Sequence, residues 1–280
     1  MSKRPAVWLP ILAKLWPMTW KGARFVARLK PVPILGKLAE KLSLPMFTGK
    51  NLNVSYIPIG EVVDGTGGNS VLTREIVAEL IKRSSHRVII GTCTCRDAKR
   101  CENHPIDFGC IQLGEGTRQI DARIAKHVSV QECLDYLDQA VANGLTPMVG
   151  RVRIDDLLWG VKNEGRMMAV CLCCRCCCTI MNSCRYWPPE AAGSLHRLKG
   201  LAIVNDAQAC TGCRTCLEGC FMEAISPAPG GGMRIDPDRC KGCGYCVNVC
   251  EHKAMKAVCD DVDAAVEEFV NRVGTLISIT

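Results

Sequence analysis

Residues 210–220 read CTGCRTCLEGC, and residues 240–250 read CKGCGYCVNVC. Both stretches have the spacing C-x-x-C-x-x-C-x-x-x-C, and the second follows the first at an offset of thirty residues. Three thiols with this spacing wrap a compact loop around one cluster, whereas the fourth starts a helix and points away. Zinc sites use two paired cysteine knuckles, which would leave the third and fourth thiols of each run without a role. The doubled spacing therefore predicts iron–sulfur ligation rather than a zinc site or a disulfide framework.

The repeat extends beyond the cysteines. Asp206 matches Asp236, and Ala224 matches Ala254, at the same offset of thirty residues. A duplicated strand–loop–helix–strand unit explains these matches. On these motifs, residues 201–258 closely resemble the bacterial-type ferredoxin with two [4Fe-4S] clusters. The resemblance covers about a fifth of the chain and implies a ferredoxin-like dicluster domain there.

The resemblance also implies which cysteines bind each cluster, because the fourth cysteine of each run ligates the other cluster in the bacterial arrangement. The family usually has a proline after each fourth cysteine, whereas this chain has Phe221 and Glu251. That proline packs and does not bind, so its replacement concerns potential and solvent exposure rather than cluster identity. The implied ligands are Cys210, Cys213, Cys216 and Cys250 for the first cluster, and Cys240, Cys243, Cys246 and Cys220 for the second.

Cysteine usage indicates the compartment. The chain has 280 residues, enough for one or two domains, and 21 of them are cysteines. A secreted disulfide scaffold fits poorly, because the chain is long and several cysteines are adjacent, which disfavours disulfide geometry. We expect a reducing cytoplasm in an anaerobic or microaerobic organism, since exposed clusters and thiolates oxidise readily.

The basic charge is concentrated in an N-terminal arm. Residues 1–50 hold ten Lys or Arg and one acid, Glu40, within a chain of net charge +7. Three of the five tryptophans, Trp8, Trp16 and Trp20, also lie there. The apolar stretches are interrupted, which argues against a transmembrane helix or a signal peptide. Two short basic amphipathic patterns follow, at residues 21–30 and 34–44.

Basic amphipathic helices with tryptophan prefer the bilayer interface or a partner protein, and we weigh these two partners equally. Nucleic acid fits less well, because the large apolar component would have no role. The arm therefore predicts a membrane surface or a membrane-protein subunit as partner, at the inner face of the cell membrane, besides redox protein partners.

Residues 51–200 predict a small α/β-type middle domain within an overall α+β fold. Glycine-rich stretches in it complete no dinucleotide or P-loop pattern. Ser129 is expected to cap a helix that ends at Ala142. A helix of residues 259–280 is expected to end the chain. The further expected elements are strands at residues 53–59, 87–90, 146–152 and 167–172 and a helix at residues 71–83.

A second cysteine set marks the strand ends of the middle domain. Such a concentration of thiols invites oxidation unless it binds metal. We expect one or two additional iron–sulfur clusters here, with Arg96 and Arg175 balancing their negative charge. Cys133 fits better as a buried apolar residue, and Cys259 fits either role. Not all of the candidate ligands are expected to bind; they are Cys93, Cys95, Cys101, Cys110, Cys171, Cys173, Cys174, Cys176, Cys177, Cys178 and Cys184.

The run CLCCRCCC at residues 171–178 constrains how such clusters are held. If the run were extended, Cys171, Cys173 and Cys177 would face one way and the other three cysteines the opposite way. Either two clusters lie on opposite sides, or a folded loop wraps one larger cluster. Cys93 and Cys95 could complete a shell.

Residues 50–258 also resemble a largely unassigned family of ferredoxin-domain iron–sulfur proteins from anaerobes, through YIPIG, CTCR, GCIQLGEG and CLCCRCCC. The resemblance implies a third cluster site without naming a reaction. We expect an electron-transfer protein associated with a membrane redox complex. Two alternatives stay open: a reductase whose middle-domain cluster, of noncubane type for instance, reduces a disulfide or another small substrate, and an iron–sulfur scaffold for maturation.

Overall fold

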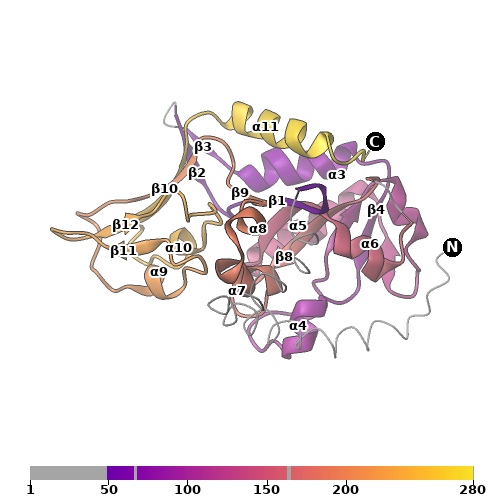
Figure 1. Ribbon diagram of the computed structural model, residues 1–280, viewed down its shortest axis with the longest axis horizontal. Helices are drawn as coiled ribbons and strands as arrows, with labels where there is room; N and C mark the ends of the chain where they lie inside the picture. Colours follow the sequence, from indigo (N-terminus) through magenta and orange to yellow (C-terminus); the bar gives the residue numbers. More distant parts are fainter. Residues whose placement is uncertain (1–48, 66–67, 163–164, 280) are drawn as a thin grey trace, which may run out of the picture.

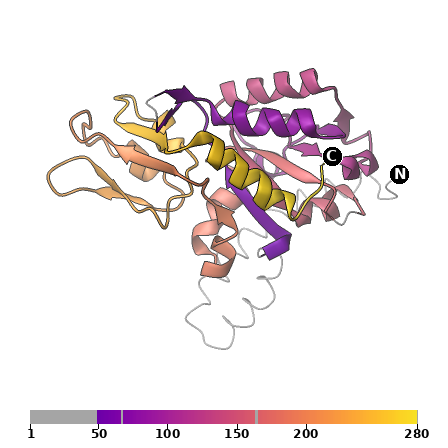
Figure 2. The same ribbon diagram turned by 90° about the horizontal axis from the view of Figure 1, so that it is seen from above.

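The computed structural model describes residues 49–65, 68–162 and 165–279. The arm expected at residues 1–50 lies outside these residues except for its last two. The described chain forms a broad middle domain from which the ferredoxin-like module projects (Figures 1 and 2). Helices and strands are mixed throughout, which confirms the α+β class. No helix in these ranges is both long and apolar enough to cross a membrane.

A seven-stranded sheet forms the centre of the middle domain, with the order β6-β4-β5-β8-β7-β1-β9. All neighbouring strands are antiparallel except β1 and β9. The middle domain is thus mixed α and β, as expected, around a mainly antiparallel sheet, a strand direction that the sequence pattern does not fix. The strands are β1 (Leu52–Tyr56), β4 (Arg87–Ile90), β5 (Ile111–Leu113), β6 (Ala125–His127), β7 (Thr146–Val152), β8 (Met168–Cys173) and β9 (Leu195–His196).

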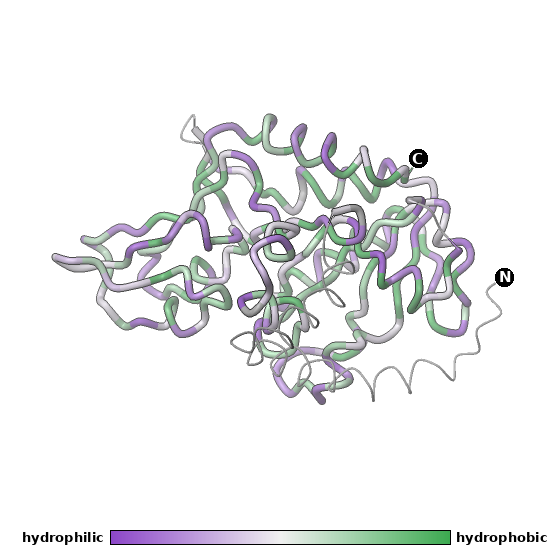
Figure 3. Tube along the Cα trace, in the orientation of Figure 1, coloured by the Kyte–Doolittle hydropathy of each residue, from purple (hydrophilic) through white to green (hydrophobic). Residues whose placement is uncertain are grey.

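The two faces of this sheet have different roles, because successive residues of a strand point to opposite faces. Val149 and Val170 join the main core, which includes Phe269 of the C-terminal helix. Met148 and Cys173 join a second core on the other face. The strands of the middle domain are largely hydrophobic, whereas the projecting end of the ferredoxin-like module is not (Figure 3). The second face is the one that carries thiols.

Short helices connect the strands. The helix expected at residues 71–83 is present as a π-helical segment, Thr73–Ala78, that continues into α3 (Glu79–Arg83). The cap predicted at Ser129 is confirmed, since Ser129 and Glu132 form a capping box at the start of α5 (Val130–Ala142). The other helices of this domain are α4 (Thr94–Lys99), α6 (Arg153–Trp159), α7 (Thr179–Ser183) and α8 (Pro189–Ala192), with 3-10 turns at Gly49–Asn51, Glu115–Gln119 and Cys184–Tyr186.

The ferredoxin-like module is a duplicated unit whose halves exchange hydrogen bonds. The amide of Asp206 donates to the carbonyl of Ala254 over 2.8 Å, and the amide of Asp236 donates to the carbonyl of Ala224 over 2.7 Å. The thirty-residue offset is therefore repeated in the backbone contacts. The elements are β10 (Leu201–Asn205), α9 (Thr215–Glu218), β11 (Ile225–Pro227), β12 (Met233–Ile235), α10 (Tyr245–Asn248) and β13 (Met255–Cys259).

The middle domain holds this module at two places. Strand β13 pairs with β10 on one side and with β2 (Val62–Asp64) on the other, and β2 pairs with β3 (Asn69–Ser70). The four-stranded sheet thus takes strands from both sides of the boundary expected at residue 200. After β13, α11 (Val262–Gly274) returns to the middle domain, where the Arg272 guanidinium donates to Ser55 Oγ over 2.7 Å.

Gly219→Ala is expected to destabilise the folded protein. An added Cβ would lie 2.0 Å from Cε1 of Tyr245, so the ring would have to move. Overpacking of this kind costs about 1–3 kcal/mol, measurable by denaturant unfolding without oxygen. Thr215 occupies the position that matches Tyr245 in the first repeat. In a Tyr245→Thr background the Gly219→Ala cost should therefore largely disappear, and an unchanged cost would contradict this account.

Candidate iron–sulfur sites

The two quartets of the ferredoxin-like module line two separate cavities. One cavity is lined by Cys210, Cys213, Cys216 and Cys250, and the other by Cys220, Cys240, Cys243 and Cys246. The fourth cysteine of each run thus lies with the first three of the other run, as the crossed arrangement requires.

Two aspartates shape the loops that lead into these quartets. The Asp206 carboxylate accepts hydrogen bonds from the amides of Gln208 and Ala209, and that of Asp236 accepts them from Asp238 and Arg239. Both loops are therefore ordered by the same side chain–backbone turn. This turn explains why the aspartates occur at the same place in both repeats.

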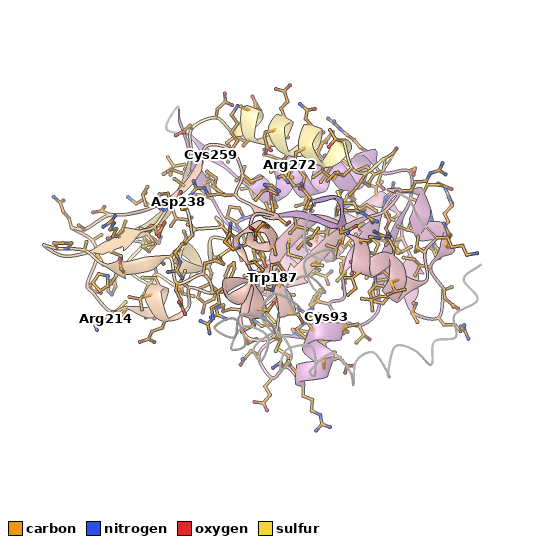
Figure 4. All side chains as sticks on the ribbon, in the orientation of Figure 1. Cys93, Trp187, Arg214, Asp238, Cys259 and Arg272 are labelled. Atoms are coloured by element: carbon orange, nitrogen blue, oxygen red, sulfur yellow. The ribbon has the colours of Figure 1, made fainter. Side chains whose placement is uncertain are left out.

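The two quartets differ in their surroundings. Cys213 is exposed, and a hydrogen bond from the Thr215 amide lowers its pKa. Burial instead raises the pKa of Cys243 to about 12. Cys213 of the first quartet is thus open to solvent, next to Arg214 on the projecting part of the module (Figure 4), whereas Cys220, Cys240 and Cys243 of the second pack against a core of the middle domain.

Phe221 connects the second quartet to the middle domain. It stands where the family has proline, and it is buried with its ring edge-on to Tyr56 at a centroid distance of 5.4 Å. Tyr56 belongs to β1 and packs in the same core as Cys173 and Cys178. Phe221, which replaces the proline, therefore packs between the ferredoxin-like module and the middle domain.

Seven cysteines of the middle domain line one cavity, which we call the inner thiol cavity. The Sγ atoms of Cys110 and Cys171 are 3.7 Å apart, and those of Cys173 and Cys178 are 3.3 Å apart. Cys171 and Cys173 reach the cavity together because they share a face of β8. Cys93 lies at the start of α4 (Figure 4). The seven are Cys93, Cys95, Cys110, Cys171, Cys173, Cys174 and Cys178.

Four thiols, of which Cys174 also lines that cavity, form a tighter cluster beside it, which we call the outer thiol group. Their Sγ atoms all lie within 4.8 Å of one another. Asn182 holds the turn that carries three of them, since its side-chain amide donates to the carbonyls of Arg175 and Cys178 over 3.1 and 2.9 Å. The four are Cys101, which follows α4, and Cys174, Cys176 and Cys177.

The extended geometry considered for residues 171–178 does not occur beyond Cys173. Strand β8 ends there, and the amide of Cys178 donates to the carbonyl of Cys174 in a turn. Cys177 therefore lies in the outer thiol group and Cys178 in the inner thiol cavity, the reverse of simple alternation. The cysteines do lie in two groups rather than around one centre.

Three remaining cysteines lie in neither group. Cys184 is buried, with its Sγ 3.4 Å from Sδ of Met222, and burial raises its pKa. Cys133 is buried in α5, where burial raises the pKa of its thiol to about 12. Cys259 is buried in β13. The role predicted for Cys133, a small apolar residue, fits this position.

Arg96 lies between the two thiol groups and is fully buried. Its guanidinium donates to the carbonyls of Pro105 and Leu172, each over 2.7 Å, and to that of Phe108. It also contacts the Cys174 thiol, and although burial opposes the effect, thiolate charge at Cys93 and Cys174 raises the pKa of Arg96. No carboxylate pairs with it in the described part of the chain.

The sequence does not mark two residues near the thiols, Tyr56, which appears only within YIPIG, and Asp155. Tyr56 packs in the core that contains Cys173 and Cys178. Asp155 lines the inner thiol cavity and is buried, which raises the pKa of its carboxyl to about 7 although a hydrogen bond from Gln112 acts to lower it. No local pattern marks either residue, because β1 and α6 approach the thiols only in the folded sheet.

Comparison with known proteins identifies part of the chain. Residues 209–255 match the family model of a 4Fe-4S dicluster domain. Over 71 residues the chain is 43% identical to the dihydromethanopterin reductase (acceptor) of Methanosarcina mazei, which is 25% of this chain and 29% of that protein. The chain thus matches less than a third of that relative's length. No solved structure matches. The C-terminal part therefore carries a 4Fe-4S dicluster domain, which supports iron–sulfur electron transfer.

Substitution of the fourth cysteine of each run by serine tests the crossed ligation. We expect Cys250→Ser to give the same anaerobic EPR spectrum as Cys213→Ser, and Cys220→Ser the same spectrum as Cys243→Ser. Each variant should lose about four iron and about four sulfide per chain, because one whole cluster is lost. If Cys220→Ser instead matched Cys213→Ser, each run would bind its own cluster and the crossed assignment would fail.

Proposed function

We propose that this protein transfers electrons between the two [4Fe-4S] clusters of its ferredoxin-like module and at least one further iron–sulfur cluster held in the inner thiol cavity. Cluster chemistry supplies one-electron transfer at a potential set by hydrogen bonds, charge and exposure. The ferredoxin ligands are the crossed quartets described above. The further cluster would take its ligands from Cys93, Cys95, Cys110, Cys171, Cys173 and Cys178.

The position of Tyr56 carries this proposal. Burial raises the pKa of Tyr56, and so do the charges of Cys178, Cys173, Cys184 and Cys243. Thiols of the inner thiol cavity and of the second quartet thus act on the same hydroxyl group. Tyr56 and Phe221 are buried and in contact, and they pack with cysteines of both thiol sets.

Arg96 supports the presence of a negatively charged metal centre. A buried charge without a partner is strongly unfavourable, and three backbone carbonyls supply only partial charges. Neutral thiols would leave the guanidinium uncompensated, whereas metal-bound thiolates compensate it. The cavity chemistry therefore fits a thiolate-bound cluster.

Iron and acid-labile sulfide counts with EPR, in protein purified without oxygen, test the proposal. We expect more than the roughly eight iron and eight sulfide of two cubanes, and a signal that Cys171→Ser removes while the ferredoxin signals persist. After rapid reduction, Tyr56→Leu and Phe221→Leu should slow the appearance of that signal. A chain holding only about eight sulfide would contradict the proposal.

Arg96→Gln is expected to lower the iron content of the middle domain while the ferredoxin clusters remain, because buried thiolates lose their counter-charge. Arg96→Lys keeps the charge and should retain most of that iron. Arg118→Gln, at an exposed ion pair with Glu115, serves as the control. Equal iron loss in Arg96→Lys and Arg96→Gln would show that the hydrogen bonds to carbonyls matter, not the charge.

A second candidate function, a reductase, is favoured by one observation. An open cleft of about 520 Å³ lies beside the exposed thiol of Cys176, and it is lined by Arg175 and His104 of the middle domain and by Tyr245 and Asn248 of the ferredoxin-like module. Its volume suits a small molecule. A disulfide bound there would take two electrons from the clusters and two protons from solvent to give two thiols.

The two functions differ in what oxidises the reduced protein. A reductase predicts that small disulfides reoxidise the ferredoxin clusters at a saturable rate, which optical absorption can follow. If only a redox protein partner reoxidises the clusters, the reductase function is excluded and electron transfer remains. The scaffold alternative predicts iron transfer to an apo-partner, and stable iron through gel filtration under argon would count against it.

The role proposed for residues 1–50 is docking to a membrane surface or a membrane-bound subunit at the inner face of the cell membrane. Deleting residues 2–48 should release the protein from the membrane fraction, because the basic and tryptophan-rich residues are removed together. Binding of the full chain to protein-free anionic vesicles would indicate lipid, and binding only to native membranes would indicate a subunit. Unchanged fractionation after the deletion would contradict both forms of docking.

A further inference from the structure

We infer that the outer thiol group is a mononuclear metal site, in which Cys101, Cys174, Cys176 and Cys177 hold a single zinc or iron ion without inorganic sulfide. This inference does not depend on the proposed electron-transfer route. It differs from the expectation that these four cysteines are candidate ligands of a further iron–sulfur cluster.

The spacing of the sulfur atoms carries the inference. All four Sγ atoms lie within 4.8 Å of one another, and those of Cys101 and Cys176 are 3.6 Å apart. Four sulfurs placed tetrahedrally around one ion, each at about 2.3 Å, are about 3.8 Å apart. Cubane thiolates bind four different irons and must be more widely separated. The outer thiol group therefore matches a single ion.

The ferredoxin-like module provides an internal comparison. Among residues 49–65, 68–162 and 165–279, no other set of three or more cysteine, histidine or carboxylate ligand atoms is as close together. Neither quartet of the dicluster domain meets this spacing. The inner thiol cavity has close pairs, Cys110 with Cys171 and Cys173 with Cys178, but no three of its thiols are mutually this close. Four mutually close thiols therefore occur only in the outer thiol group among the described residues.

The surroundings of the outer thiol group also suit a thiolate centre. Cys101 accepts hydrogen bonds from the amides of Asn103 and His104, and Cys174 contacts the Arg96 guanidinium. Four thiolates around a divalent ion have a net charge of about −2, and a positive guanidinium beside them reduces it. Tetrahedral sulfur coordination is typical of zinc and of iron.

The site would act as a cross-link. Cys101 and Cys176 are 75 positions apart in the chain, and they join the end of α4 to the turn after β8. The same two segments carry Cys95 and Cys178, which line the inner thiol cavity. A metal ion in the outer thiol group would therefore hold together the two segments that supply ligands to the neighbouring cavity.

Metal and sulfide counts on the full chain, purified without oxygen, test this inference. Cubane clusters contain iron and sulfide in equal numbers, so the wild-type chain should hold about one metal ion in excess of sulfide. Cys176→Ser should lose that ion and no sulfide, and Cys133→Ala, at a buried thiol outside both groups, should lose neither. The excess of metal over sulfide in the wild-type chain tests the inference even if a variant fails to fold.

Two results would overturn the inference. One is equal loss of iron and sulfide in Cys176→Ser, which would make the outer thiol group part of a cluster. The other is a wild-type chain whose metal and sulfide counts are equal. Mass spectrometry shows whether the excess metal is zinc or iron. If it is zinc, protein produced with cobalt in its place should show the absorption bands of tetrahedral cobalt thiolate.

Discussion

Charge compensation in a buried, sulfur-rich interior is the constraint on which this structure depends. Thiolates and guanidinium groups are each costly to bury alone, and together they offset part of that cost. Arg96 lies between two thiol groups and is held by three backbone carbonyls rather than by a carboxylate. The chemistry of the middle domain and its packing therefore depend on each other.

The same interior explains how the middle domain and the ferredoxin-like module are joined. A two-cluster ferredoxin usually ends each cysteine run with proline, and here Phe221 fills that position and packs on Tyr56. One quartet has an exposed thiol, Cys213, while three cysteines of the other pack against the core of the middle domain. The module thus has a solvent-facing side and a protein-facing side, which gives the proposed electron path a direction.

Much of the ferredoxin-like module could be predicted from sequence because its ligand spacing is local. Strands β4 and β7 were also predicted at their observed bounds, since short buried runs carry their own signal. The distribution of Cys177 and Cys178 between two thiol groups could not be predicted, because it depends on where β8 ends. The roles of Tyr56 and Asp155 depend on contacts that only the folded sheet creates.

The pairing of β2 with β13 has a consequence for synthesis. Val63 and Val258 are partners in this parallel pair, although nearly two hundred residues separate them. Such distant pairings form slowly, because a long loop must close first. The four-stranded sheet can therefore be completed only after residues 255–259 have been synthesised. A ferredoxin excised at residue 201 would have an unpaired β13 edge, prone to association with other chains.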